Sequence, residues 1–275
     1  MKKLLFIVSI CICTSSFSQY YYNDIIANIE SNQGYSLLKS NKIKTITVSS
    51  FDANNQLEKN FSLTQEFTAD FKKMVTKSTT ATGATSIITT LYKNNKIAST
   101  NEMTDNIETK SEYSYNESSQ LKSIISSSKD TALKSKSIET HIWFYNESNK
   151  PTLMLKIKNN SDTTRIEMVL DNHGNIVEEH WKRGTKTIET YYYYYNENEK
   201  LTDIVRFNKR AQKLLPDFLF EYDTKGRLSK MIQVPAGNSN YSIWQYSYND
   251  QGLKQEESCT NRQKDLIGKV VYRYQ

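Results

Sequence analysis

The sequence is poor in glycine and proline, the residues that most often interrupt regular structure. Its 275 residues include 8 glycines and 3 prolines, well below the roughly 7% and 5% of average proteins. This scarcity excludes collagen-like chains and Pro/Gly-rich disordered chains. Aromatic residues make up 12% of the chain. That content argues against general disorder, because each ring supplies a large area to bury.

A charge of one sign and long apolar runs are also lacking. The formal net charge is +6, and no long basic stripe accompanies it, so the sequence predicts a solvated surface of mixed sign and no nucleic-acid partner. No segment approaches the 18 or more consecutive apolar residues typical of a membrane-spanning helix. We therefore expect no transmembrane segment.

The N-terminus has the three-part layout of a secretory signal peptide: a basic start at residues 1–3, an apolar run at 4–13 and a polar end at 14–18. Ser16 and Ser18 are small residues at positions −3 and −1, which predicts cleavage before Gln19. The protein is therefore expected to be exported to the periplasm or the medium. The mature chain would keep one cysteine, Cys259, and hence no internal disulfide.

One phrase recurs along residues 45–275, and its clearest copy is Phe220-Glu221-Tyr222-Asp223-Thr224-Lys225-Gly226-Arg227-Leu228. The aromatic or apolar residue before the Asp or Asn anchors each copy, and the anchors stand at 51, 91, 115, 145, 170, 195, 222, 248 and 274. From position 115 onward the intervals between anchors are 25 to 30 residues. Such regular spacing indicates an internal structural repeat.

The phrase has the chemistry of a tight turn. An Asp or Asn begins it and a Gly or Asn stands three residues later, which is typical of a type I turn closed by an Asx side chain. Ser119 and Glu199 occupy the Gly position in two copies, so those turns are expected to close differently. The predicted turn residues are Asp52, Asn116, Asn146, Asp171, Gly174, Asn196, Asp223, Gly226, Asn249 and Gly252.

The residues before each turn alternate, with one face heavily aromatic, as in half-buried antiparallel strands. Each repeat then reads as a β-hairpin, and eight turns imply about sixteen strands. We predict an all-β fold: an antiparallel meander of β-hairpins forming a curled sheet, an open shell or a two-layer sheet. The tyrosines before the turns would form a ladder of cross-strand pairs.

Two segments lie outside this pattern. Residues 19–44 form a lead-in segment before the repeat domain of residues 45–275, and the apolar spacing from Asp24 to Lys39 predicts a short N-terminal helix. From Gln65 to Val75 the apolar residues fit a helix and a strand equally well.

The repeated phrase resembles the Tyr-Asp (YD) repeats of Rhs-type proteins, in short exported versions from Gram-negative bacteria. The resemblance covers roughly residues 45–275 and is carried by the turn phrase alone. It implies a secreted β-sheet tract, sometimes described as carbohydrate-binding. It implies no catalytic residues, because the repeat is structural in that family too.

Residues with catalytic or metal-binding chemistry are few. His173, Glu178 and His180 are one conceivable metal set, but a turn His and a strand His explain them better. Asp52, Asp171 and Asp223 could be paired carboxylates of a glycosidase, but each is better explained as the side chain that closes its turn. We predict no catalytic, cofactor or metal residues, and no enzyme.

The aromatic excess has two interpretations. Most rings are expected to pack in the core, while Phe144, Trp181, Tyr192 and Tyr194 form a possible binding face. The function predicted is a non-enzymatic β-repeat protein of the cell envelope that binds glycan or protein. An outer-membrane β-barrel and an enzyme acting on polysaccharide are the alternatives. The barrel would require an apolar outer wall, whereas these strands carry Lys and Glu throughout.

Overall fold

A computed structural model describes residues 20–209, 211–235 and 240–275. The predicted signal peptide and its cleavage site lie outside these residues. One helix, α1 (Tyr22–Ser40), precedes eighteen β-strands. The predicted all-β class, the hairpin meander and the short N-terminal helix are confirmed.

Within the described residues the strands follow one another with no other helix between them. They are β1 (Thr45–Phe51), β2 (Ser62–Phe67), β3 (Lys73–Thr79), β4 (Thr85–Lys93), β5 (Lys96–Thr104), β6 (Ile107–Tyr115), β7 (Leu121–Asp130), β8 (Ser135–Tyr145), β9 (Pro151–Lys158), β10 (Asp162–Leu170), β11 (Ile176–Arg183), β12 (Lys186–Tyr195), β13 (Leu201–Asn208), β14 (Lys213–Tyr222), β15 (Leu228–Gln233), β16 (Ser242–Tyr248), β17 (Lys254–Thr260) and β18 (Leu266–Tyr274). The segment from Gln65 to Val75, open between helix and strand, belongs to β2, β3 and the turn between them.

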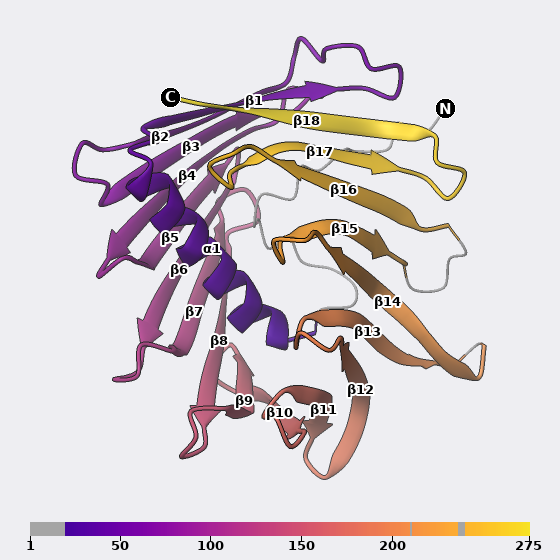
Figure 1. Ribbon diagram of the computed structural model, residues 1–275. Coiled ribbons are helices and arrows are strands. Elements are labelled where there is room, and N and C mark those ends of the chain that lie inside the picture. Colours follow the sequence, from indigo (N-terminus) through magenta and orange to yellow (C-terminus); the bar gives the residue numbers. More distant parts are fainter. Residues whose placement is uncertain (1–19, 210, 236–239) are drawn as a thin grey trace.

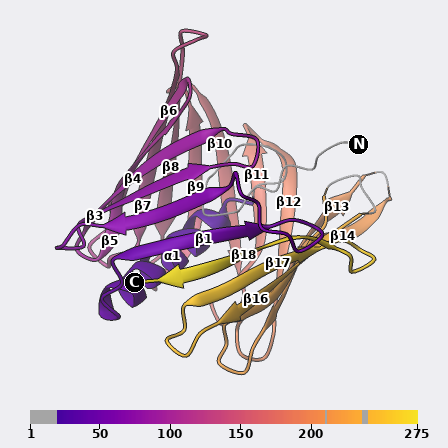
Figure 2. The ribbon, with the colours of Figure 1, turned by 90° about the horizontal axis from the view of Figure 1, so that it is seen from above.

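The sheet closes on itself. Each strand pairs antiparallel with its neighbours in sequence, and β1 pairs with both β2 and β18, in a register that sets Ile46 opposite Tyr274. Figure 2 shows β1 and β18 side by side. The expectation of a curled sheet, open shell or two-layer sheet was therefore wrong in this respect, because an eighteen-stranded barrel leaves no unpaired edge. A closed barrel is the shape that the outer-membrane alternative requires.

Most predicted turns lie at one end of the barrel. Turns after even-numbered strands share one end, which we call the Asx rim, and turns after odd-numbered strands share the opposite rim, because consecutive strands are antiparallel. At the Asx rim, Asp223 Oδ1 accepts hydrogen bonds from the backbone N–H groups of Lys225 and Arg227, both at 2.9 Å. Asn116, Asn146, Asp171, Asn196 and Asn249 accept the equivalent bond from the residue four positions later.

Two turns that were expected to close differently have the common geometry. Ser119 and Glu199 adopt φ values of +66° and +56°, close to the +74° of Gly226. Their N–H groups donate to the carbonyl oxygens of Asn116 and Asn196, each at 2.9 Å. The Asx side chain and the flanking strands thus impose the left-handed conformation even where a side chain makes it unfavourable.

Two other copies depart from the pattern. The turn at Asp52 has the Asx bond to Gln56, at 2.8 Å, but it follows β1 and therefore lies at the opposite rim. The copy from Leu91 to Ile97 instead closes through Asn94 and Asn95, which have φ values of +53° and +58° between the paired residues Lys93 and Lys96. Such a pair of left-handed residues is typical of a two-residue hairpin turn.

Where a tyrosine occupies the anchor position, its hydroxyl connects its repeat to the preceding one. Tyr195 donates its hydroxyl to the carbonyl oxygen of Ile176 at 2.8 Å, and Tyr222 donates to Leu201 at 2.7 Å. The same bond recurs at Tyr115, Tyr145, Tyr248 and Tyr274. Neighbouring repeats are thus joined by a hydroxyl-to-backbone bond, instead of the side-chain ladder expected from the sequence.

The aromatic face of the strands points into the barrel, and α1 lies inside it (Figure 1). Tyr21 and Ile25, at the start of the helix, pack with inward residues of strands between β6 and β14. Its last turns, with Tyr35 and Leu38, pack against β1–β4 and β18. The core is therefore the helix together with the inner wall around it.

The positive φ at Ser119 gives a test of the turn geometry. Replacing Ser119 with Gly should raise the free energy of unfolding by up to about 1 kcal/mol, because glycine adopts this conformation without the cost that a side chain carries. Urea denaturation of the mature chain measures it. Ser118→Gly, in the same turn at a residue without positive φ, should lower stability by several tenths of a kcal/mol. Equal losses in both variants would contradict the assigned geometry.

Candidate functional site

A cleft of about 930 Å³ separates α1 from part of the Asx rim. The helix contributes Ile25, Ile29 and Gln33, and the rim contributes turn residues before and at the start of β5, β7, β9 and β11. Ile29 is 48% exposed although it is a large apolar side chain. This volume and mixed lining are typical of small-molecule sites.

A ring of four hydrogen bonds holds α1 against the rim beside the cleft. Asn32 Oδ1 accepts from the Ile97 N–H at 2.9 Å, and Asn32 Nδ2 donates to Asn28 Oδ1 at 3.0 Å. Asn28 Nδ2 donates to the Tyr115 hydroxyl oxygen at 2.9 Å, and that hydroxyl donates to the Ile97 carbonyl at 2.9 Å. These amides position the helix, while Gln33 and Asn94 face the cleft without a side-chain hydrogen bond to the described residues.

The charged residues of the cleft lining are both basic. Lys96 Nζ lies 4.7 Å from the centroid of the Tyr115 ring and donates to the carbonyl of Ser119. Lys150 extends over Gly174, so closely that a Cβ at Gly174 would lie 2.7 Å from Lys150 Cε. Gly174 thereby lets the Lys150 side chain lie along the rim. No Asp or Glu is among the described residues that line the cleft.

The first turn of α1 is fixed by a buried carboxylate from the barrel wall. Glu179 on β11 is 0% exposed and accepts hydrogen bonds from the backbone N–H groups of Tyr21 and Tyr22 at 2.8 and 3.0 Å. Trp181 Nε1 and the Tyr193 hydroxyl donate to it at 2.5 and 2.6 Å. Burial raises the pKa of Glu179, while these four donors oppose that rise. The carboxylate also faces the positive end of the helix dipole.

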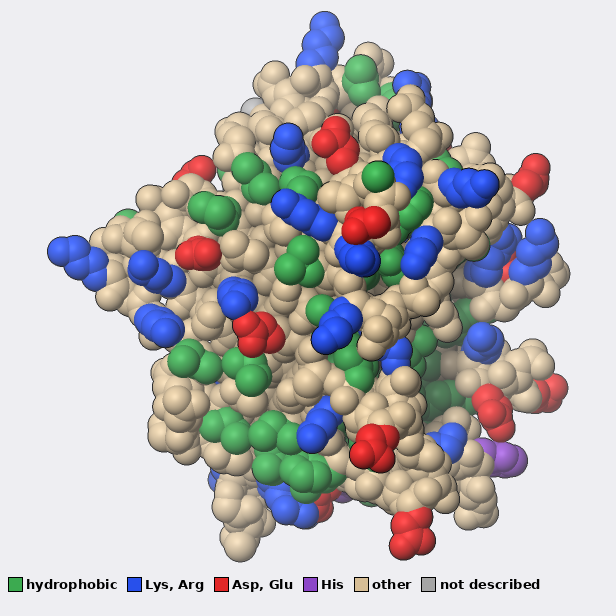
Figure 3. Space-filling model, turned by 90° about the vertical axis from the view of Figure 1, so that its left-hand side faces the viewer, with side chains coloured by type: hydrophobic (Ala, Val, Ile, Leu, Met, Phe, Trp, Pro, Cys, Tyr) green, Lys and Arg blue, Asp and Glu red, His purple; other side chains and the backbone are tan. Residues whose placement is uncertain are grey.

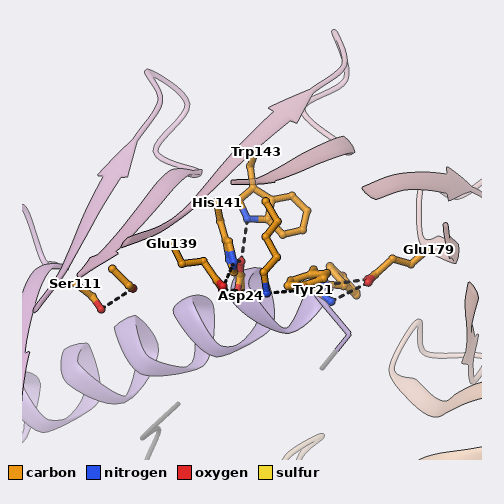
Figure 4. Close-up of polar contacts among 10 residues, drawn as sticks. Tyr21, Asp24, Ser111, Glu139, His141, Trp143 and Glu179 are labelled. Atoms are coloured by element: carbon orange, nitrogen blue, oxygen red, sulfur yellow. Dashed lines mark hydrogen bonds and ion pairs between the residues drawn. The ribbon is translucent and has the colours of Figure 1, made fainter. Parts of the chain in front are cut away.

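A second polar cluster lies beside Glu179 (Figure 4). His141 Nδ1 is 2.6 Å from Asp24 Oδ2 on α1, and His141 Nε2 is 2.9 Å from Glu139 Oε1 on the same strand. Lys156 lies 3.1 Å from Glu139 and donates to the Tyr21 hydroxyl oxygen at 2.6 Å. The cluster joins the helix to β8 and β9 by ion pairs within the barrel.

The environment shifts two of these pKa values strongly. Burial alone would lower the pKa of His141, but the carboxylates of Asp24 and Glu139 outweigh it and raise that pKa to about 9. Burial alone would raise the pKa of Glu139, but bonds from His141 and Lys156 bring it down to about 2. At neutral pH the docked helix therefore holds a protonated imidazole between two carboxylates.

The four residues of the predicted binding face are not brought together. Phe144 and Tyr194 point outward, 43% and 48% exposed, but on β8 and β12. Tyr192 also points outward, opposite Glu178. Trp181 points inward, where it contacts the Tyr21 and Tyr191 rings. β-Bulges shift the pairing of β11 with β10 and with β12, and such a shift changes the face to which a side chain points. The face of Trp181 could therefore not be assigned from the sequence.

The sequence-level candidates for chemistry lie apart. His173 is exposed in its turn, 3.6 Å from Glu199, while His180 bonds Glu178 at 2.6 Å on the outer wall. Among the described residues no group of three His, Cys, Asp or Glu side chains could hold a metal ion. Cys259 is buried, and burial raises its pKa to about 11.

The residues that dock the helix were not predicted as a site. Asp24, Glu139, His141 and Glu179 were not singled out, although Glu139 and His141 share the inward-facing register of the aromatic side chains on their strand. A charged residue within that register was the available signal, because a buried charge needs a partner.

Comparison with known proteins shows limited likeness. No family model and no curated protein sequence matches the chain. A porin-like protein from Bacteroides uniformis resembles it with 9% identity and a TM-score of 0.40, over 85% of this chain and 98% of that one. A porin-like protein from Bacteroides vulgatus has 10% identity and a TM-score of 0.28, over 85% of this chain and 98% of that one. The TcdB2-TccC3 structure without its hypervariable C-terminal region has 9% identity and a TM-score of 0.35, over 78% of this chain and 12% of that one.

In residues 20–209, 211–235 and 240–275, no helix has the length and apolar character to cross a membrane.

The His141 cluster predicts how stability changes with pH. Because the folded-state pKa of about 9 exceeds the unfolded value of 6.5, its stabilisation is fully present below pH 6.5. It is lost as the pH rises to 9, by up to about 3 kcal/mol. Denaturant titrations of the mature chain at pH 6 to 9.5 should show this loss.

Two variants isolate the cause of that slope. His141→Gln should be less stable at pH 6 and should lack most of the decline toward pH 9.5. His173→Gln, which removes an exposed turn histidine, should keep it. A decline of wild-type size in His141→Gln would mean that other groups produce it.

Proposed function

We propose that this protein is an exported, non-enzymatic β-barrel of the bacterial cell envelope that binds a glycan in the cleft between α1 and the Asx rim. The observation that carries the proposal is the cleft itself, with its amides, its tyrosines and its exposed Ile29. Planar amides and ring faces are the groups that bind hydroxyl-rich ligands with apolar C–H faces. Export, the absence of enzymatic activity and the YD-repeat resemblance stay predictions.

The architecture suits a binding role because α1 is held rigidly. The Asn28–Asn32 ring fixes the helix beside the cleft, and Glu179 fixes its first turn. A cleft whose two walls are fixed loses little conformational entropy when a ligand binds. The Tyr hydroxyl bonds from repeat to repeat likewise fix the positions of the rim turns.

Polar groups on the outer wall favour a barrel that faces water. Ion pairs join outward side chains, such as Lys110 with Glu112 at 2.6 Å and Lys182 with Glu167 at 2.6 Å. Figure 3 shows Lys, Arg, Asp and Glu side chains interspersed with apolar ones over one flank. A basic side chain facing lipid at mid-membrane costs about 2–4 kcal/mol, so a water-facing wall suits these strands better.

The closed barrel favours a second candidate, an outer-membrane β-barrel. Closure satisfies every strand edge, which a sheet inside a bilayer requires. Apolar outward pairs on β8 and β9, such as Phe144 with Leu153 and Ile142 with Leu155, are suited to contact with lipid. The outward charges on β6, β10 and β11 are not. The two candidates therefore differ in what surrounds the barrel wall.

Ligand binding can be tested at the exposed isoleucine. The mature protein should bind members of a glycan array, and Ile29→Glu should abolish those signals, because it replaces the apolar surface at the centre of the cleft with a carboxylate. Ile107→Glu, which changes a similarly exposed residue at the opposite rim, should leave them unchanged. The absence of any glycan signal, or equal binding by both variants, would contradict the proposal.

Fractionation separates the two candidates. A water-facing barrel should be released from cells by osmotic shock or found in the medium, and should stay soluble without detergent. An outer-membrane barrel should sediment with membranes, resist carbonate extraction and need detergent. Lys110→Leu gives a further comparison, since an outward apolar side chain should stabilise a barrel in lipid and not one in water.

A further inference from the structure

The cleft between α1 and the Asx rim has an uncompensated positive charge. Lys96 and Lys150 line it together with 19 other residues, none of which is Asp or Glu. Within the described residues the Lys150 side chain has no ion pair and no hydrogen bond. Outside the cleft, by contrast, several lysines form an ion pair with a glutamate: Lys110, Lys156, Lys182, Lys230, Lys254 and Lys269. The cleft therefore differs from the barrel walls in its local charge.

The two ammonium groups are positioned by their neighbours. Lys96 lies over the Tyr115 ring and donates to the Ser119 carbonyl. Lys150 can lie along the rim because residue 174 is a glycine, with φ of +80° and no Cβ against the lysine chain. Lys200 lies over Gly226 in a similar way, 3.6 Å from the position of a Cβ there. This repeated arrangement orders a long flexible side chain before any ligand binds.

The rest of the lining suits a sugar body. Ile25, Ile29 and Pro151 offer apolar surface, while Gln33 and Asn94 offer amide donors and acceptors. Sugar rings have apolar C–H faces and hydroxyl edges, so both kinds of surface can be used at once. A negative group on the same ligand would then meet the two lysines without a competing carboxylate in the lining.

We propose that the ligand of this cleft is an acidic glycan, whose carboxylate, sulfate or phosphate group binds Lys150 and Lys96. This inference rests on the proposed glycan-binding function and adds the charge of the ligand to it. Lys150 is the residue that distinguishes acidic from neutral glycans, and Gly174 positions its side chain. The charge-assisted bonds that it forms are stronger than those between neutral groups.

The test uses pairs of oligosaccharides that differ only in charge. Each acidic member is compared with its carboxyl-reduced or desulfated partner, and dissociation constants for the mature protein are measured by calorimetry at 50 and 300 mM NaCl. The acidic member should bind at least about tenfold tighter at low salt, and the difference should shrink at high salt.

Variants assign that preference to Lys150. Lys150→Gln should reduce the ratio between acidic and neutral affinities to within about twofold, and Lys150→Arg should restore it. Lys225→Gln is the matched control, because Lys225 is an exposed lysine in an Asx turn of the same rim, outside the cleft lining. It should keep the wild-type ratio. Unchanged thermal unfolding midpoints would show that all three variants fold.

The possible failures are distinguishable. Equal affinity for acidic and neutral members would overturn the inference and leave the proposed function in place. A preference for acidic members that Lys150→Gln retains would also overturn it, because the charge would then be read elsewhere. Binding by no member of any pair would overturn the inference and the proposed function together.

Discussion

The pairing of β1 with β18 is the constraint on which the rest of this structure depends. Six residue pairs from Ile46↔Tyr274 to Phe51↔Lys269 close the sheet, and Gln275 exchanges backbone hydrogen bonds with Thr45. Once closed, the strands separate an inner from an outer face. Because the buried, mostly apolar side of the strands points inward, closure creates an interior that has to be filled, and α1 occupies part of it.

The helix inside the barrel is held by polar groups at its first turn and at its middle. Glu179, together with the cluster around His141, fixes the first turn, and Asn28 and Asn32 fix the middle against the rim. Buried ionic groups are stable only when all of their partners are in place. This makes the docked position specific, and that position defines one wall of the cleft.

Much of the architecture could be predicted because it rests on local chemistry. The Asx turn at Asp223 needs only its own five residues, and the alternation before it assigns Tyr222 to one face whatever the neighbouring strands do. The candidate site could not be predicted in the same way. Lys150 and Gly174 meet because their turns are neighbours on the Asx rim, and Ile29 joins them only because α1 crosses that rim. Trp181 contacts Tyr21 and Tyr191 on the inner face, because the bulges in the pairing of its strand shift the register.

The sequence by itself determined the hairpin repeat, the inward tyrosines and the helix that precedes them, since each follows from interactions within a few residues. It also limited the chemistry that the protein can perform, because the chain has few histidines and the aspartates of the repeated phrase serve to close their turns. Only the tertiary structure decided that the sheet closes, because closure depends on pairing between strands more than 200 residues apart. Contacts between distant parts of the chain likewise brought Glu179 to the helix and left Lys150 facing a cleft without a carboxylate.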